Sequence, residues 1–389
     1  MTVRDLVTVG IGGDAIRARI SNVFGNEPLS VGAASVGLAA TGAAVVPGTL
    51  HTLTFGGVER TVVPVGQVTY SDAVSMPVSD LQKLAISVYT SGRELVTVHP
   101  CCTKIDSYFT PNGGGDLTES VSGVGLSEPS PWERWVDAVD VLQTSGQGSI
   151  VVVGDSITDG YHAALRWTDV LQSRIDMLPP GEQRAVVNEG ITANALTSVV
   201  NTDDLTGGGP SGVSRLARDA LTQSGVSEVI LFLGTNDLWF GATAEQVIAG
   251  YEQAIAAAHG DGIRIVAVTL LPRSSSRVER WTPLQQSYLE RVDQWILTSR
   301  AFDAVLDLGA TVADVYDGAC APAVMFPPYD SGDHLHPDAQ GQTAMGDAVD
   351  ATALDLPPLP LVPPLVAVTP TPGCEGVAGI PAPSQPRSG

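Results

Sequence analysis

A serine, an aspartate and a histidine that are able to act together stand at two distant places in the chain. Ser156 follows the apolar, β-branched run 150–153, where a buried strand is expected to end in a loop. Asp333 and His336 are three residues apart, so one loop can hold the carboxylate against an imidazole nitrogen. A serine hydroxyl becomes an effective nucleophile only when a neighbouring base takes its proton. The combination predicts nucleophilic catalysis by Ser156, with His336 as the base and Asp333 as the acid that orients it.

Two more polar segments follow apolar runs. Residues 188–194 come after the run 185–187, and residues 234–237 come after the run 231–233. The carboxyl ends of parallel strands meet at one edge of a sheet, and ligands bind in the crevice there. We therefore expect both segments to lie beside Ser156 at that edge.

These segments resemble, in order, the sequence blocks of the SGNH (GDSL-type) serine hydrolase family. The matching residues are Ser156, Gly190, Asn236, Asp333 and His336. The resemblance implies that Ser156 attacks an ester carbonyl, that His336 acts first as base and then as acid, and that Asp333 orients the imidazole. It also implies an oxyanion hole formed by the backbone N–H groups of Ser156 and Gly190 and by the side-chain amide of Asn236. No cofactor is expected for this chemistry.

The resemblance covers roughly residues 148–354 and departs from the family pattern at two minor places. Ile157 stands where the GDSL name has leucine, and Thr192-Ala193 replaces a pair of small residues that usually contains glycine. Upstream, the stretch Arg17–Gly25 resembles the N-terminal accessory domain of one bacterial branch of the family. Two roles for such a domain stay open: it binds a glycan or shapes the mouth of the site, or it only stabilises its neighbour.

Each of these residue types also occurs in simpler roles. Ser156 alone would often be a helix N-cap, and Asn236 alone an ordinary turn residue. His334 and His336 with Asp333 could instead bind a metal ion, which would make the protein a metal-dependent hydrolase. Against this, the other acidic residues are not clustered as metal ligands are, and His336 is already needed as the base. We therefore expect Ser156 as nucleophile, Asn236 as an oxyanion donor and no metal.

Four further residues are candidates for a place near the site. Trp239 and Phe240 closely follow the asparagine block and are candidates for the substrate pocket, with core packing as the equal alternative. Arg273 follows an apolar run and is expected to be a solvated charge, with a place on the rim of the site as the alternative. Asp155 is expected to fix the loop before the nucleophile by hydrogen bonds rather than to act chemically.

Composition excludes some partners. The 389 residues carry a formal net charge of -22, so the phosphates of a nucleic acid would be repelled over most of the surface. Prolines interrupt the longest uncharged apolar tract, from Leu356 onward, so no membrane span is expected. The expected partner is a small-molecule or glycan ester, and a monomer is the default oligomeric state.

The start of the chain and its cysteines bear on location. Arg4, Asp5 and Asp14 interrupt the region where a signal peptide would need its apolar core. Either the protein is cytoplasmic, or an export signal has been removed. The four cysteines, an even number, are either two bridges or free buried thiols, and they favour a secreted protein. They are Cys101, Cys102, Cys320 and Cys374.

The hydrophobic pattern predicts two folds in succession. Short strands punctuated by turn residues over the first 110 positions are typical of an antiparallel sandwich or jelly roll. Alternating strands and helices from residue 148 predict a flavodoxin-like three-layer α/β/α unit around a parallel sheet. The expected domains are a β-sandwich or jelly-roll accessory domain at 1–110, a connecting segment at 111–147, the hydrolase domain at 148–355 and a proline-rich tail at 356–389.

Individual elements are expected at the following places. N-terminal strands are predicted at 6–9, 16–20, 29–38, 50–55, 60–65, 84–89 and 95–98. In the hydrolase domain, strands are predicted at 149–154, 185–188, 226–233, 263–269 and 304–306, and helices at 164–177, 213–223, 244–259, 283–299 and 339–350.

The expected function is that of a serine carboxylic ester hydrolase acting on short-chain or acetyl esters, those of glycans included. One alternative is a non-catalytic glycan-binding protein with a vestigial hydrolase domain. The other is a metal-dependent hydrolase that uses Asp333, His334 and His336.

Overall fold

The computed structural model describes residues 1–92, 98–99, 106–130, 133–144, 148–198, 208–273, 281–314 and 324–360. All four cysteines, most of the predicted strand 95–98 and the tail from residue 361 lie outside these ranges. The cysteine bridges and the secreted location that they favour therefore stay predictions. Within the described ranges, no helix combines the length and the apolar character needed to cross a bilayer.

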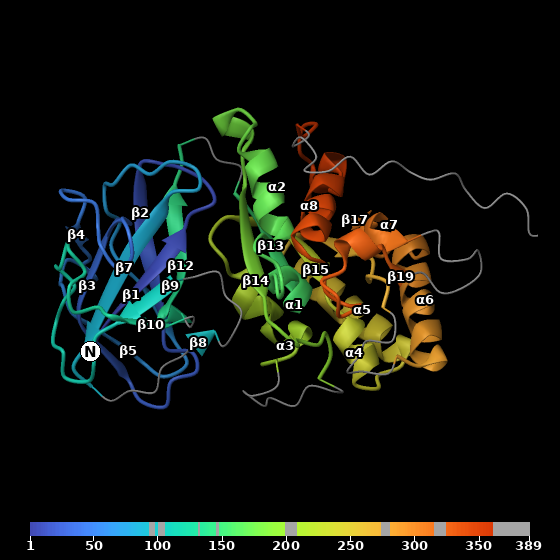
Figure 1. The fold of residues 1–389 in the computed structure, drawn as a ribbon, viewed down its shortest axis with the longest axis horizontal. Coiled ribbons are helices and arrows are strands. Elements are labelled where there is room, and N and C mark those ends of the chain that lie inside the picture. The colour runs from blue at the N-terminus through green and yellow to red at the C-terminus, as the bar shows by residue number, and fades with distance from the viewer. Residues whose placement is uncertain are drawn as a thin grey trace, which may run out of the picture.

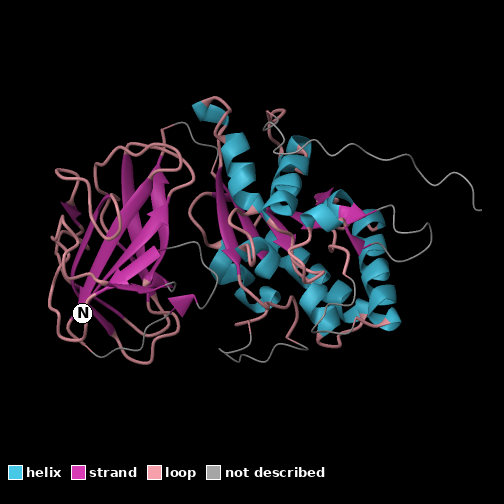
Figure 2. Ribbon diagram, in the orientation of Figure 1, coloured by secondary structure: helices cyan, strands magenta, loops and turns pink. Residues whose placement is uncertain are grey.

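Five strands form an all-parallel sheet at the centre of the C-terminal unit (Figures 1 and 2). They are β13 (Ser149–Gly154), β14 (Ala185–Gly190), β15 (Val226–Phe232), β16 (Arg264–Val268) and β17 (Ala304–Leu306). Their order across the sheet is β14-β13-β15-β16-β17. This is the flavodoxin-like order. In folds of this order, ligands bind in a crevice beyond the carboxyl ends of the strands where the chain connections change direction, which here are β13 and β15. The predicted fold class of this unit is confirmed.

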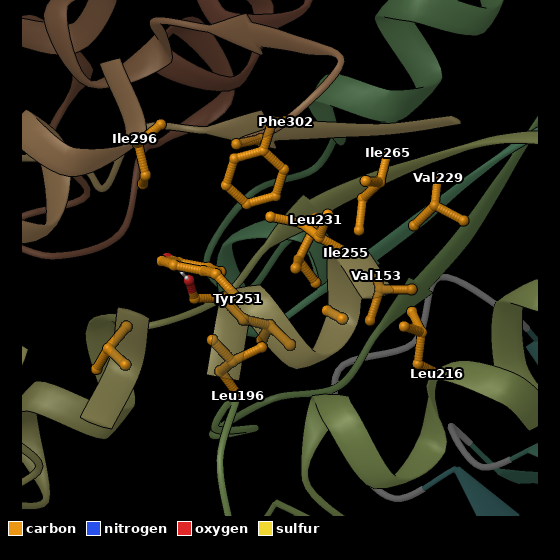
Figure 3. Close-up of a cluster of buried hydrophobic side chains, with 14 of the residues drawn as sticks. Val153, Leu196, Leu216, Val229, Leu231, Tyr251, Ile255, Ile265, Ile296 and Phe302 are labelled. Atoms are coloured by element: carbon orange, nitrogen blue, oxygen red, sulfur yellow. Dashed lines mark hydrogen bonds between the residues drawn. The ribbon is translucent and has the colours of Figure 1, made fainter. Parts of the chain in front are cut away.

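Helices cover both faces of this sheet, as Figure 1 shows. On one face lie α5 (Ala244–Gly260) and α6 (Pro283–Thr298), and on the other α2 (Trp167–Ile175) and α8 (Ala339–Ala348). Successive strand residues point to opposite faces, so each face has its own apolar core. Val153 of β13 belongs to the core under α5 and α6, part of which Figure 3 shows. Its neighbour Val152 belongs to the core under α2 and α8.

Capping residues determine where the longer helices begin, because the first backbone N–H groups of a helix have no partner within it. Ahead of α5, the side chain of Thr243 accepts a hydrogen bond from the backbone N–H of Gln246. In return, the side chain of Gln246 accepts one from the backbone N–H of Thr243 at 2.9 Å. Thr282 and Gln285 form the same capping box ahead of α6, whose first residue is a proline. Both helices therefore begin at the predicted residues.

The predicted helix 213–223 is two short pieces instead. They are α3 (Gly212–Leu216) and the π-helical turn η2 (Ala217–Leu221). The backbone N–H of Thr222 donates to the carbonyl of Ala217, five residues back, at 3.1 Å. Such a turn holds one residue more than an α-helical turn, and it is frequent at functional sites. Hydrophobic periodicity cannot reveal one inserted residue.

Several shorter elements complete the C-terminal unit. Two of them, α1 (Ser156–Asp159) and α4 (Thr235–Trp239), begin just beyond β13 and β15 and thus at the crevice. The others are η1 (Pro180–Glu182), α7 (Leu308–Val312), β18 (Ala313–Asp314), β19 (Val324–Met325), η3 (Pro327–Tyr329) and η4 (Ala351–Leu354). Strands β18 and β19 pair with each other.

The N-terminal unit is antiparallel and rich in strands. They are β1 (Thr2–Thr8), β2 (Ala15–Ser21), β3 (Leu29–Leu38), β4 (His51–Thr52), β5 (Thr61–Val63), β6 (Val68–Tyr70), β7 (Lys83–Thr90), β8 (Val98–His99), β9 (Asp106–Phe109), β10 (Glu128–Ser130), β11 (Glu133–Arg134) and β12 (Val136–Leu142). One sheet has the order β10-β9-β1-β7-β3-β4, with β5 also on β3, and a second has the order β12-β2-β6. The two sheets share one apolar core, where Ile86 of β7 and Ile20 of β2 are buried.

Strand β1 begins earlier than predicted. The prediction missed its first residues because they include a buried charged side chain. Arg4 lies inside β1 and is fully buried, which an alternating apolar pattern does not anticipate. Its guanidinium donates to Ser87 Oγ at 2.7 Å and to the carbonyl of Ser120 at 2.9 Å. These partners come from another strand and from a loop, so the arginine is satisfied without water. The predicted strand 50–55 is also shorter than expected, since only β4 is formed there.

The predicted connecting segment 111–147 takes part in the N-terminal sheets. Strand β12 lies in it and pairs with β2, from Val136 opposite Ile20 to Leu142 opposite Ala15. Strand β10, also within it, pairs with β9. We therefore propose that the N-terminal unit ends near Leu142 rather than at residue 110.

Gln342 of α8 gives the first test of this fold. Its Oε1 accepts from the backbone N–H of Trp167 at 2.8 Å, and its Nε2 donates to the carbonyl of Ile157 at 2.9 Å. The variant Gln342→Ala removes the partner of two buried backbone groups, so we expect the free energy of unfolding to fall by about 2–4 kcal/mol. Denaturant titration measures the change, with Gln340→Ala, on the exposed side of the same helix, as the control. Equal stability of the two variants would contradict the assignment.

Candidate active site

The three residues predicted to act together lie in one hydrogen-bonded row. Ser156, the first residue of α1, has its Oγ 2.8 Å from His336 Nε2. His336 Nδ1 is 2.6 Å from Asp333 Oδ2. A proton on Nδ1 is shared with the carboxylate, so Nε2 is left to accept the serine proton. The arrangement is therefore competent for base-assisted attack by the serine.

A tight loop holds Asp333 in place. Its Oδ1 accepts from the backbone N–H groups of Leu335 at 3.0 Å and His336 at 2.8 Å. Burial alone would raise the pKa of Asp333, but the hydrogen bonds and the charge of His336 hold it well below its usual value. The carboxylate therefore stays ionised next to the imidazole that it orients.

Asp155, not Ser156, caps helix α1. The Asp155 carboxylate accepts from the backbone N–H of Ile157 at 2.9 Å, which leaves the serine hydroxyl available to His336. Ser156 therefore does not serve as the N-cap in this structure. Burial raises the pKa of Asp155 to about 6, although the Ile157 N–H and the charges of His336 and Arg273 oppose the shift.

Gly190 and Asn236, the predicted oxyanion donors, lie on either side of β13. Gly190 pairs with Gly154 at the end of the sheet, and its N–H donates to Asn188 Oδ1 at 2.9 Å. Asn236 begins α4 with Thr235, and its Nδ2 donates to the carbonyl of Asn194 at 2.9 Å. Both donors are thus engaged within the protein in this structure, and an oxyanion would have to exchange with those partners.

Two buried charged residues that the sequence analysis did not identify fix the loop after β14. Asp237 accepts from the backbone N–H groups of Leu196 at 2.6 Å and Thr197 at 2.8 Å. Arg215 is fully buried and donates to Asn194 Oδ1 and to the carbonyl of Gly154, each at 3.0 Å. Asp237 follows Asn236 directly, which was a signal in the sequence. Arg215 had none, because its partners are distant in the chain.

Two aromatic rings next to the row of Ser156, His336 and Asp333 were also missed. The rings of Tyr161 and His336 have centroids 4.9 Å apart and meet edge to face. His162 Nε2 is 3.9 Å from Asp333 Oδ2, and this residue has a left-handed backbone with φ of 61°. A non-glycine residue in that region is uncommon, so the surrounding structure holds His162 in place.

The expectation that Arg273 is a solvated charge was wrong. Arg273 is only 4% exposed, and its guanidinium lies 4.6 Å from the ring centroid of Trp239 and 5.0 Å from that of Trp281. These cation–π contacts replace part of the hydration that the charge has lost. Of the two pocket candidates, Trp239 is half-buried and Phe240 is 49% exposed, so Phe240 is not a core residue.

The three residues of the metal alternative do not form one group, because the His334 ring is paired elsewhere. His334 Nδ1 is 2.6 Å from Asp330 Oδ2, whereas His336 is paired with Asp333. Across the described part of the chain, no three histidine, cysteine or acidic side chains are grouped in a way that could hold a metal ion. The two histidines therefore have separate partners.

Comparisons with known proteins give a family match. A model of the GDSL-like lipase/acylhydrolase family matches residues 152–344. Among solved structures, the native M. smegmatis aryl esterase is 22% identical, with a TM-score of 0.41, over 54% of this chain and 99% of that one. A catalytic mutant of an acetylxylan esterase from Geobacillus stearothermophilus is 17% identical, with a TM-score of 0.39, over 53% of this chain and 94% of that one. No curated protein matches the chain.

The raised pKa of Asp155 gives a pH-dependent test. An unfolded aspartate has a pKa of about 3.9, whereas that of folded Asp155 is about 6. The free energy of unfolding therefore falls as the pH rises from the lower to the higher of these pKa values, and it stays lowered at every higher pH. The variant Asp155→Asn keeps an acceptor for the helix cap and removes the charge. We expect it to raise the unfolding midpoint more at pH 8 than at pH 5, with the exposed Asp261→Asn as the control. A larger gain at pH 5 would contradict burial as the cause of the raised pKa.

Proposed function

Because residues 152–344 belong to the GDSL-like lipase/acylhydrolase family, we propose that this protein hydrolyses carboxylic esters through an acyl-serine intermediate. The observation that carries the proposal is the continuous row from Ser156 Oγ through His336 to Asp333, with distances of 2.8 and 2.6 Å. A nucleophile, a base and an orienting acid in this order are what acyl transfer requires.

The reaction proceeds in two halves. In the first, Ser156 Oγ attacks the ester carbonyl while His336 Nε2 takes its proton, and His336 then donates that proton to the departing alcohol. In the second, His336 takes a proton from water, and the resulting hydroxide attacks the acyl group and releases the acid. His336 returns the proton to Ser156 Oγ, so the site is restored. Asp333 stays ionised and stabilises the imidazolium in both halves.

Charge that develops on the carbonyl oxygen requires donors. We propose the backbone N–H groups of Ser156 and Gly190 and the Nδ2 group of Asn236 for this task. Gly190 lies at the end of β14 beside β13, and Asn236 Nδ2 is 3.5 Å from Asp155 Oδ2, next to the nucleophile. These positions support the assignment, and their present partners at Asn188 and Asn194 stand in for the oxyanion.

The substrate is proposed to be a short-chain or acetyl ester, with acetylated glycans among the candidates. Ser156 and His336 are each only 7% exposed, so a small acyl group reaches the hydroxyl more easily than a bulky one. Trp239 and the exposed Phe240 are proposed to contact the remainder of the substrate. Turnover of nitrophenyl esters of graded chain length and of acetylated oligosaccharides, measured side by side, tests this proposed substrate.

The non-catalytic alternative is less well supported. A vestigial site need not keep the hydrogen bonds between nucleophile, base and acid, and in this protein both are short. The metal alternative lacks a gathered ligand set in the described residues.

Removal of the nucleophile is the direct test. Ser156→Ala is expected to lower turnover of nitrophenyl acetate by about a millionfold, because the base loses the hydroxyl that it activates. Ser287→Ala, on the exposed face of α6, is the matched control and should leave turnover unchanged. Ser156→Ala with full activity would refute the serine mechanism. Activity lost on chelation and restored by added metal would favour the metal alternative.

Removal of one oxyanion donor should have a smaller effect. Asn236→Ala is expected to lower kcat by about 10²–10³ while KM changes little, because the amide acts on the charge of the transition state. Thermal unfolding of the same variant shows how much stability is lost with the bond to Asn194. A loss in KM alone would assign Asn236 to substrate binding instead.

A further inference from the structure

Several hydrogen bonds join the N-terminal unit to one short segment of the C-terminal unit, residues 215–224. Arg17 Nη2 donates to Ser224 Oγ at 3.4 Å, and Arg19 Nη1 donates to Gln223 Oε1 at 3.1 Å. Both arginines come from β2, and both acceptors follow the π-helical turn η2. The segment 215–224 thus carries a polar contact surface for the N-terminal sheet.

The stretch Arg17–Gly25 supplies most of the side chains that contact segment 215–224. The ring of Phe24, within it, lies 4.8 Å from the guanidinium carbon of Arg218. Arg19 is 7% exposed, and its Nε donates to Asp137 Oδ1 of β12 at 2.7 Å, so its guanidinium is held rigidly. Arg17, Arg19 and Phe24 of this stretch therefore all contact the C-terminal unit.

Gln223 continues the contact into the parallel sheet. Its Nε2 donates to Glu189 Oε1 at 2.9 Å. Glu189 pairs with Val153 on β13, and the next residue, Gly190, pairs with Gly154. Two hydrogen bonds therefore lead from Arg19 in the N-terminal unit to the residue next to the proposed oxyanion glycine.

Arg215, at the other end of the segment, reaches the second part of the site. It is held by Asp219 Oδ2 at 3.1 Å and donates to the carbonyl of Gly154 and to Asn194 Oδ1. The Asn194 carbonyl in turn accepts from Asn236. Segment 215–224 thus bonds the Gly154 carbonyl, two residues before Ser156, and the side chains of Asn194 and Glu189.

Strand β14 needs such support because it is an edge strand. Among the described strands it pairs with β13 alone, and it is the strand of the parallel sheet that lies nearest the N-terminal unit in Figure 1. Catalytic groups must be held within about 0.5 Å of their working positions, and an edge strand with one hydrogen-bonded neighbour is less constrained than a central one. Contacts from outside the sheet supply the missing constraint.

We propose that Arg19 and Gln223 are positioning residues of the active site, through which the N-terminal sheet fixes the end of β14 and the proposed oxyanion donor Gly190. This inference rests on the proposed function, since it assigns a catalytic purpose to the contact. It gives the N-terminal unit a role in turnover itself and needs no glycan bound to it. Arg19 and Gln223 touch neither the substrate nor the reacting atoms.

The test uses the full chain and nitrophenyl acetate. Arg19→Ala and Gln223→Ala are each expected to lower kcat about tenfold with KM unchanged, which is less than the 10²–10³ for outright loss of a donor. Because both residues act through the same contact, the double variant should be no slower than Gln223→Ala alone. Thermal unfolding of each variant shows whether it is folded. If one of the two single variants fails to fold, the other still tests the inference.

Asp80→Ala is the matched control. Asp80 Oδ2 accepts from Gln183 Nε2 at 3.5 Å, which also joins the two units, but Gln183 precedes the opposite end of β14. This variant should keep the kcat of the native protein, whereas a general loosening of the two units would lower it as well. Arg19→Ala and Gln223→Ala with kcat within twofold of native, or with additive losses, would overturn the inference. An inactive native protein, or one indifferent to Ser156→Ala, would instead overturn the proposed function.

Discussion

The hydrogen bond between Ser156 and His336 requires distant parts of the chain to be brought together. Its two residues are 180 positions apart, and they meet only because α8 returns to lie against α2, behind the first strand of the sheet. Gln342 holds that return in place by bonding to backbone groups on both α1 and α2. The contact between Ser156 and His336 is therefore a direct consequence of how the last helix packs against the sheet.

Buried charge is the second constraint at the crevice. Asp155, Asp237 and Arg215 are each almost fully buried there, where an unpaired charge would be costly. Each has backbone partners: Asp155 caps a helix, Asp237 holds two N–H groups of a loop, and Arg215 bonds the carbonyl of Gly154. A polar network that is satisfied in this way leaves its members little freedom, which is what a site for a developing oxyanion requires.

The two units are joined by polar contacts rather than by a common apolar core. The stretch Arg17–Gly25 meets the C-terminal unit at the π-helical turn η2 and just after it. Arg215 before that turn and Gln223 after it bond residues near Ser156 and Gly190. An inserted residue in a helix changes the direction in which the following side chains point. The turn therefore allows Gln223 to face Arg19 on one side and Glu189 on the other.

The sequence by itself determined the five parallel strands and the longer helices with their order, because strand and helix periods, caps and turn residues are local properties of the chain. The five parallel strands appear where they were predicted, and Ser156 and Asn236 both follow strands that end at the crevice. Only the tertiary structure decided the rest: β12 joins the N-terminal sheet, Arg273 is buried against two indole rings, and Arg215 bonds the backbone of the crevice. Whether a charged side chain is solvated or buried depends on partners that arrive from distant parts of the chain, and no local pattern records them.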